Sequence, residues 1–442
     1  MFSRYGDILA LPGARTFFWW GLFSRLQIGM TSLATFLLVQ IEYGSYATAG
    51  LVVGVLSIGA AIINPQISRL VDEHGQSRVL RFGFGIAVLA RLVFVAAALM
   101  HAPTWALLLI LPFFAAAGAQ STLTRARWTH IVPDRHALNS AFSLESSMEE
   151  VLFIAGPALS TILATQVASW LPSIVAAVSL LVGGYYFLSL RDTEPPARRG
   201  DAGTSPLTSV PVIDGSLPRV GLEAQPRRVR RYRRPLRGHL LVTTPALILT
   251  SVIFATQGAL FASADASTVA FSEELGQKQW SGTVLAIFAL GSLIGGLLYG
   301  SRVWSRTLAS RLLWGVTASG IGALTFHLAG NLAWLAVLMF VTGLAIAPTM
   351  AVGDGVVHAL VPRTRVTEGM AWTRVGLDMG VAFGAWATGL AIDSIGSHGG
   401  FMVTGWAGAV GIVLMLGGWR YLRRKKAYEE KVSREPAARL LS

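Results

Sequence analysis

Long apolar stretches separated by short polar segments dominate the pattern of this chain. A transmembrane helix needs about 20 predominantly apolar residues to cross a hydrocarbon layer of about 30 Å, and twelve stretches meet that requirement. They are residues 17–41, 46–67, 82–100, 104–124, 139–166, 170–190, 241–270, 281–300, 312–329, 332–353, 369–392 and 400–419. The strands of a membrane barrel would instead show alternating segments of roughly 10 residues. The pattern therefore predicts an all-α integral membrane protein with twelve transmembrane helices.

Positive charge is concentrated in alternate gaps between these stretches. All but four of the 36 Lys and Arg residues lie in one alternate set of segments, which includes both ends of the chain. Of the four, Lys278 lies in the other set, and Arg25, Arg91 and Arg374 lie within apolar stretches. Cytoplasmic loops of membrane proteins carry the excess of Lys and Arg. We therefore predict a multi-pass protein of the cell's inner (plasma) membrane, with its N- and C-termini in the cytoplasm.

The composition excludes an ordinary soluble protein. Charged residues make up 13% of the chain, against roughly 25% in soluble domains. The formal net charge of +13 lies mainly in the predicted cytoplasmic segments, and this placement favours contact with anionic membrane lipid over a nucleic acid. The chain has no Cys, which excludes disulfides, thiolate nucleophiles and Cys-ligated metals.

A polar segment divides the apolar stretches into six and six. It is rich in Pro and Arg, a composition that cannot form a packed core, and we interpret it as a solvated linker, with a lipid-binding tether as the alternative. The predicted domains are an N-terminal six-helix bundle at 1–190, a cytoplasmic basic linker at 191–240, a C-terminal six-helix bundle at 241–420 and a cytoplasmic basic tail at 421–442.

Acidic residues of the fifth stretch are the leading candidates for function, because an ionised group at mid-helix costs about 2.5–3.5 kcal/mol to insert. Glu145 and Glu149 are four residues apart and share one helix face. Mutual repulsion and burial both favour protonation of such a pair, as proton coupling requires. We predict Glu149 as the deepest of them and as the proton carrier, followed by Glu145 and Glu150. The alternative is a structural set paired with arginines of adjacent helices.

The eleventh stretch carries charge at the same depth as the fifth. An offset of 229 residues places Glu145 over Arg374 and Glu149 over Asp378, which suggests an internal repeat. The simpler interpretation of Arg374 and Asp378 is a salt bridge within one helix. The alternative is that Arg374 pairs with the glutamates of the other half in one state, and Asp378 then becomes a further candidate for proton coupling.

Three polar residues of the first and third stretches are candidates for binding substrate or for ion pairs in the cavity. They are Arg25, Gln27 and Arg91. Arg25 is expected to hold either an anionic substrate or a glutamate of the fifth stretch, with a fixed interhelical pair as the alternative.

A motif between the second and third stretches resembles one of the major facilitator superfamily, whose signature is Gly-x-Leu-Ala-Asp-Arg-x-Gly-Arg-Lys-x-x-Leu. The matching residues are Leu70, Asp72, Gly75 and Leu80, while Ser68, Glu73, Gln76 and Ser77 depart from it and Arg78 is one of the nearest basic groups. The six-plus-six pattern with a long basic central segment is similar to the same superfamily. The resemblance implies two pseudosymmetric six-helix bundles, with a gate at Leu70, Asp72, Gly75 and Arg78. The alternative for this motif is a turn that merely connects two helices.

Gly156 and Pro157 resemble the Gly-Pro core of a motif that marks antiporters of this superfamily. We expect the pair to form a helix hinge or a tightly packed seam. The wider pattern resembles the bacterial sugar and drug efflux permeases, which implies proton-coupled export of a small molecule such as a drug, sugar or metabolite by alternating access. Uptake by symport, uniport, and a membrane sensor that does not transport are the alternatives.

Other chemistry finds no support in the sequence. No Gly-x-x-x-x-Gly-Lys-Ser/Thr loop is present to bind nucleotide phosphates, so we expect an ion gradient to supply the energy. The eight His residues form no metal-binding array, and no nucleophile is paired with a base. We therefore predict no enzyme activity, no cofactor and no metal, with the substrate, protons and lipid as partners of a monomer.

Overall fold

The computed structural model is built from helices. It describes residues 8–132, 135–197, 245–302, 306–361 and 366–438, together with Gly6 and Trp304. Most of the predicted linker at 191–240 and the last four residues lie outside this set. The side chains of residues 420–438, in the predicted basic tail, also lie outside it, although the backbone of the last helix continues to Ala438.

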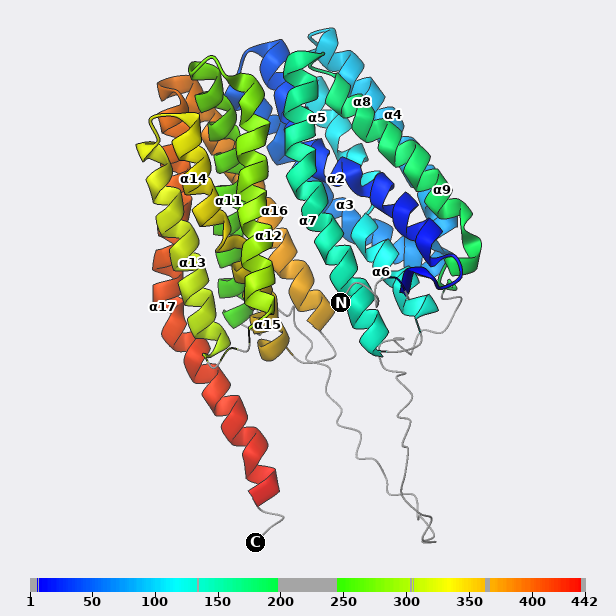
Figure 1. The fold of residues 1–442 in the computed structure, drawn as a ribbon, viewed down its shortest axis with the longest axis vertical. Coiled ribbons are helices and arrows are strands. Elements are labelled where there is room, and N and C mark those ends of the chain that lie inside the picture. The colour runs from blue at the N-terminus through cyan, green and yellow to red at the C-terminus, as the bar shows by residue number, and fades with distance from the viewer. Residues whose placement is uncertain are drawn as a thin grey trace.

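The helices form two sets that follow one order along the chain (Figure 1). The first set is α2 (Ala14–Tyr43), α3 (Tyr46–His74), α4 (Gln76–Leu99), α5 (Thr104–Ile110), η1 (Leu111–Ala117), α6 (Gln120–Ile131), α7 (Arg135–Gln166), α8 (Leu171–Val178), η2 (Ser179–Gly183), α9 (Gly184–Ser189) and η3 (Arg191–Thr193). The second set is α11 (Pro245–Glu274), η5 (Lys278–Trp280), α12 (Ser281–Gly300), α13 (Leu308–Thr325), η6 (Phe326–Leu328), α14 (Leu332–Gly343), α15 (Ile346–Leu360), α16 (Val366–Ile395) and α17 (Ser397–Ala438).

The predicted transmembrane helices are confirmed. Within the described residues, eleven helical segments are long and apolar enough to cross a membrane. The predicted span 312–329 coincides with α13 and η6, which complete the set of twelve. Three predicted spans consist of shorter helices in sequence, and the span at 104–124 is interrupted at Gly118, whose φ of 66° is a left-handed backbone conformation.

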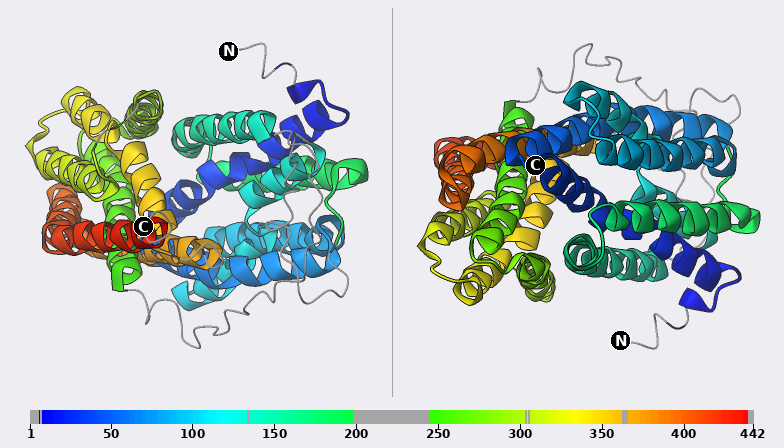
Figure 2. Two further views of the ribbon diagram at one scale, coloured as in Figure 1. Left: turned by 90° about the horizontal axis from the view of Figure 1, so that it is seen from below. Right: turned by 90° about the horizontal axis from the view of Figure 1, so that it is seen from above.

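One offset relates the two halves throughout. Adding 229 to the bounds of α7 gives 364–395, which matches α16, and adding it to α2 gives 243–272, which matches α11. The same offset relates α6 to α15 and α4 to α13 with η6. The predicted repeat is therefore present in the order and length of the helices. Figure 2 shows the two sets as separate groups of helices, joined along one line of contact.

The two halves share a hydrophobic core at only one end of the molecule. There, buried side chains of α2, α3, α11, α12 and α16 form a single cluster that includes Phe36, Val52 and Val269. At the other end, each half has its own core, one around Trp128 in the N-terminal half and one around Leu312 in the C-terminal half. We call the first the closed end, where α2, α11 and α16 end. The second is the basic end, where α4 begins and α12 and α15 end.

Polar contacts between the halves reinforce the closed end. Asp393 of α16 accepts hydrogen bonds from the Ser45 hydroxyl (2.8 Å) and from the backbone N–H groups of Tyr46 and Ala47 (2.9 Å each). A carboxylate at a helix start satisfies free N–H groups and the helix dipole, so Asp393 of one half caps α3 of the other. Glu273 accepts from the Tyr46 hydroxyl and pairs with Lys278 (3.0 Å).

Small residues allow the halves to approach closely. α3 packs along α16, and α7 packs against α12. A Cβ added at Gly50 would lie 2.1 Å from the Ala385 carbonyl oxygen, and one at Gly389 would lie 2.3 Å from the Tyr46 carbonyl oxygen. Helices in membranes associate through such small residues because lipid tails provide no hydrophobic driving force.

Candidate functional site

A buried ion pair joins the first helix to the acidic residues of α7. Nη1 of Arg25 lies 2.5 Å from Oε2 of Glu145, and the side chains are 1% and 0% exposed. Glu145 also accepts a hydrogen bond from the indole N–H of Trp128 (2.7 Å), while Nε of Arg25 donates to the Gly21 carbonyl (3.1 Å). Removing one partner from such a pair would leave a buried charge uncompensated. Glu145 therefore fits the structural alternative: an acid held by an arginine of an adjacent helix.

Glu149 lies one turn further along α7 and is less enclosed. Its Oε1 is 3.3 Å from Nη1 of Arg25, and its Oε2 is 3.3 Å from Nη2 of Arg125 on α6. The Glu149 side chain is 20% exposed and that of Arg125 is 43% exposed. Glu145, not Glu149, is thus the most enclosed of the acidic residues. Glu149 is the one that a solute or a proton can reach while it stays paired with two arginines.

Glu150 points to a different side of α7. It lines a cavity of about 420 Å³ between α7, α12 and α15, with Ser146 on its own helix and Ala347 on α15. The cavity belongs to the basic end, where the two halves have separate cores. The carboxyl of Glu150 therefore faces the space between the halves.

Gly156 and Pro157 form a packing seam in this structure. A Cβ added at Gly156 would lie 2.4 Å from the carbonyl carbon of Gly29 on α2, so these backbones are in direct contact. One added at Gly282 of α12 would lie 2.8 Å from the Pro157 carbonyl oxygen. α7 continues as a helix through this point, and the pair lies where one helix meets a neighbour in each half.

Arg374 pairs with a residue that sequence reasoning missed. Its Nη2 lies 3.6 Å from Oδ2 of Asp354 on α15, whereas we had predicted Asp378 or the glutamates of the other half. Asp378 lies near enough for electrostatic interaction with Arg374. Asp354 is also close enough to interact with Arg125 of the other half. The signal that could have found it is the offset of 229 residues, which places Asp354 over Arg125.

Gln27 and Arg91 belong to a separate buried cluster. The Arg91 guanidinium donates to the Gln27 side-chain oxygen and to the Thr31 hydroxyl (3.0 Å), and it lies 4.9 Å from the centre of the Phe114 ring. These contacts satisfy a buried cation by neutral acceptors and a ring face. They join α2, α4 and η1, which is the arrangement of a fixed interhelical pair.

The predicted gate motif is only partly engaged. Gly75 makes the expected tight turn, with φ of 92° between α3 and α4. Asp72, Leu70 and Arg78 are exposed, and Asp72 has no ion pair among the described residues. Glu194, which sequence reasoning missed, accepts hydrogen bonds from the backbone N–H (2.7 Å) and hydroxyl of Ser77 at the start of α4. Pairing of Asp72 in another state stays a prediction.

Comparison with known families decides the class of protein. The family model described as Major Facilitator Superfamily matches residues 18–312 and 266–442. The chain belongs to the major facilitator superfamily. It is therefore a membrane transporter of this superfamily, with a small molecule as its substrate. No curated protein sequence matches the chain.

Solved structures of the superfamily share the fold. The nucleoside transporter NupG is 14% identical, with a TM-score of 0.66, and the match covers 92% of this chain and 98% of that one. The peptide transporter POT, in a complex with sulfate, is 15% identical, with a TM-score of 0.63 and coverage of 94% and 95%. At this identity, the likeness extends to the fold alone.

Metal-binding groups are not found in the described part of this superfamily member. No cluster of three or more His, Asp or Glu side chains suited to a metal ion occurs among the described residues. The ionisable groups there instead pair with one another across helices, as in Arg25 with Glu145 and Arg374 with Asp354.

Proposed function

We propose that this transporter exchanges protons for a small cationic solute and exports that solute from the cell. The basic end would face the cytoplasm, since it carries most of the arginines that the described loops contribute. The cavity beside Glu150 would then open to the cytoplasm while the closed end faces outward. The single observation that carries the proposal is the position of Glu149 between Arg25 and Arg125.

Ionised Glu149 holds the Arg125 guanidinium in the N-terminal half. A proton on Glu149 removes the negative charge, and so does a bound cation that pairs with the same carboxylate. Either ligand weakens the attraction between Glu149 and Arg125. Arg125 then remains close to Asp354 of the C-terminal half, with which it interacts electrostatically. Neutralisation of Glu149 therefore favours an ion pair between the two halves.

An ion pair between Arg125 and Asp354 would draw the two halves together at the basic end. In this scheme, the basic end closes readily when Glu149 carries a proton or a solute cation, and poorly when Glu149 is empty and ionised. A carrier that crosses only in its loaded forms exchanges one ligand for the other, whereas a symporter must also cross empty. The arrangement therefore favours antiport over symport. Glu145, Glu150 and Asp378 are the secondary candidates for carrying the proton.

The charges of the described residues at this site favour a cation. Apart from the neutral pair of Arg25 and Glu145, the acidic side chains are Glu149, Glu150, Asp354 and Asp378, and the basic ones are Arg125 and Arg374. The excess of carboxylates attracts positive solutes and disfavours anions. An amine or another organic cation is thus the substrate class that we propose.

A nucleoside or a peptide is the alternative substrate class. It is favoured by the structural likeness to a nucleoside transporter and a peptide transporter. Such a solute would need hydrogen bonds more than charge, and it would fit uptake by symport as well as export. Transport of these solutes by a Glu149→Gln variant with an unchanged rate would favour this alternative.

The test uses proteoliposomes that contain the full chain, with a pH-sensitive dye inside and an imposed proton gradient. Tetraphenylphosphonium, ethidium, uridine and a dipeptide are added in turn to wild type, Glu149→Gln and the control Glu73→Gln, whose carboxyl is exposed at the end of α3. We expect proton movement driven by a cation in wild type and in the control, and its loss in Glu149→Gln. Cation-driven proton movement that survives in Glu149→Gln would contradict the role of Glu149.

A further inference from the structure

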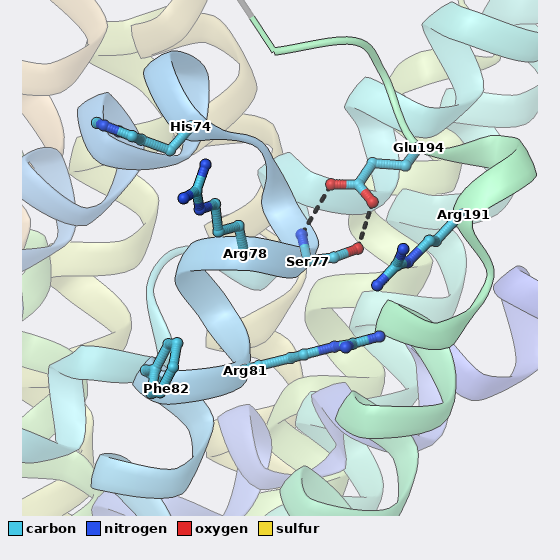
Figure 3. Close-up of a pocket in the computed structure, with 7 residues that line it drawn as sticks. All are labelled: His74, Ser77, Arg78, Arg81, Phe82, Arg191 and Glu194. Carbon is cyan, nitrogen blue, oxygen red and sulfur yellow. Dashed lines mark hydrogen bonds between the residues drawn. The ribbon is translucent and has the colours of Figure 1, made fainter.

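A second cavity lies at the basic end, away from the space between the halves. It has a volume of about 500 Å³ and lies between the start of α4 and the segment that follows α9 (Figure 3). Its lining includes Arg78 and Arg81 of α4, Arg191 of η3, and Glu194. Three guanidinium groups thus surround one carboxylate.

The carboxylate of Glu194 is already engaged. One of its oxygens accepts from the backbone N–H of Ser77 and the other from the Ser77 hydroxyl. Among the described residues, the guanidinium groups of Arg78, Arg81 and Arg191 have no ion pair. With three positive charges against one negative charge, the cavity has an uncompensated positive charge that suits an anion.

The cavity opens at the level where lipid headgroups meet the hydrocarbon layer. Phe82, which also lines it, is 76% exposed on the outer face of α4. Ile86 and Leu89 continue the same exposed face along α4, at the spacing of one helix side. Exposed apolar side chains on a transmembrane helix face lipid tails. On the neighbouring α9, the Tyr185 hydroxyl donates to the Arg81 carbonyl (2.7 Å), and Tyr is common at this depth.

We propose that this cavity binds the phosphate of an anionic phospholipid headgroup, with the acyl chains lying along Phe82, Ile86 and Leu89. Arginine matches phosphate oxygens in geometry and charge, and basic pockets between transmembrane helices bind anionic headgroups. The bound lipid would join the start of α4 to the chain after α9 and stabilise the N-terminal half. This site does not depend on the substrate or the direction proposed above.

The chemistry of a phosphate is shared by a soluble anion, so the probes must separate the two sources. Purified protein in detergent is titrated with dioleoylphosphatidylglycerol, with dioleoylphosphatidylcholine of the same acyl chains, and with inorganic phosphate. Retained lipid is counted by native mass spectrometry, and the thermal unfolding midpoint is recorded for each addition.

The variants keep the total charge matched. One carries Arg78→Gln, Arg81→Gln and Arg191→Gln, and the control carries Arg15→Gln, Arg69→Gln and Arg302→Gln, whose side chains are exposed outside the cavity. A single variant, Arg191→Gln, serves if the triple variant does not fold. Each arginine near a membrane surface contributes about 1 kcal/mol to lipid binding, which converts to about fivefold in affinity.

We expect phosphatidylglycerol to be retained and to raise the unfolding midpoint in wild type and in the control. Its affinity should fall about fivefold in Arg191→Gln and roughly a hundredfold in the triple cavity variant. Equal retention by the cavity variant and the control would overturn the site. Equal effects of the two lipids would overturn recognition of the anionic headgroup, and an equal shift from inorganic phosphate would overturn a lipid as the ligand.

Discussion

Arg125 of α6 and Asp354 of α15 occupy corresponding positions in the two halves and carry opposite charges. They are 229 residues apart, which is the offset that relates the helices of one half to those of the other. Two groups related by a pseudo-two-fold axis lie at equal distances from it, so opposite charges at such positions attract across the axis. Glu145 and Arg374 repeat this inversion with the signs exchanged. The basic end thus carries charges that favour its own closure.

Exchanging the charges of this pair should preserve closure, whereas changing one charge should prevent it. Arg125→Asp places two carboxylates near each other, and we expect transport to fall at least tenfold. The double variant Arg125→Asp with Asp354→Arg restores the attraction between the halves, although Glu149 loses its partner. We therefore expect partial recovery of substrate exchange together with weakened proton coupling. Equal activity of the single and double variants would exclude an interaction between these residues.

Closure of the basic end can be measured directly because the chain has no Cys. Ser146 of α7 and Ala347 of α15 line the same cavity from opposite halves, so a Ser146→Cys and Ala347→Cys pair reports their approach. Adding Glu149→Gln should speed cross-linking of this pair severalfold, since Arg125 is then released toward Asp354. The rate is followed by gel mobility with a short bifunctional maleimide. A slower rate with Glu149→Gln would reverse the proposed direction of the switch.

Loss of Arg25 should reduce stability more than loss of Arg125. Arg25→Gln leaves Glu145 buried without its cation, at a cost of about 3–5 kcal/mol. Arg125→Gln removes a half-exposed partner, for which about 0–1 kcal/mol is expected. The thermal unfolding of both variants in detergent measures the difference. Similar unfolding midpoints would mean that the buried ion pair contributes little to the fold.

The sequence predicts the helices well because their signal is local. About 20 apolar residues in a row specify a membrane span whatever the neighbours are, and the predicted spans coincide with the observed helices. Partners are harder to predict, because they depend on which helix faces come together. The pairing of Arg25 with the acidic residues of α7 was one of two alternatives, while Asp354 and Glu194 attracted no attention, since one lies near a helix end and the other in a polar segment.

The seam at Gly156 should not tolerate a side chain. Gly156→Ala would place a Cβ 2.4 Å from a backbone atom of Gly29, and overpacking of this kind typically costs about 1–3 kcal/mol. Gly300→Ala is the matched control, since a Cβ added there meets no atom within 4 Å. We expect a lower unfolding midpoint for Gly156→Ala and no change for the control. Unchanged stability of both variants would show that α2 and α7 can separate here at little cost.

Asp393 should determine how firmly the closed end stays shut. Asp393→Ala removes the acceptor of three hydrogen bonds at the start of α3, each contributing about 1.5–3 kcal/mol because the acceptor is charged. Part of that energy is recovered from water, so we expect a shift of the population toward opening at this end. A Ser32→Cys probe reports it, because Ser32 lines a small cavity enclosed by both halves near Asp265. Labelling by a membrane-impermeant maleimide from the outer side should rise in Asp393→Ala and stay low in Asp72→Ala, which changes an exposed carboxylate at the basic end. If Asp393→Ala leaves labelling at the level of Asp72→Ala, the apolar core shared by the halves is sufficient to keep this end closed.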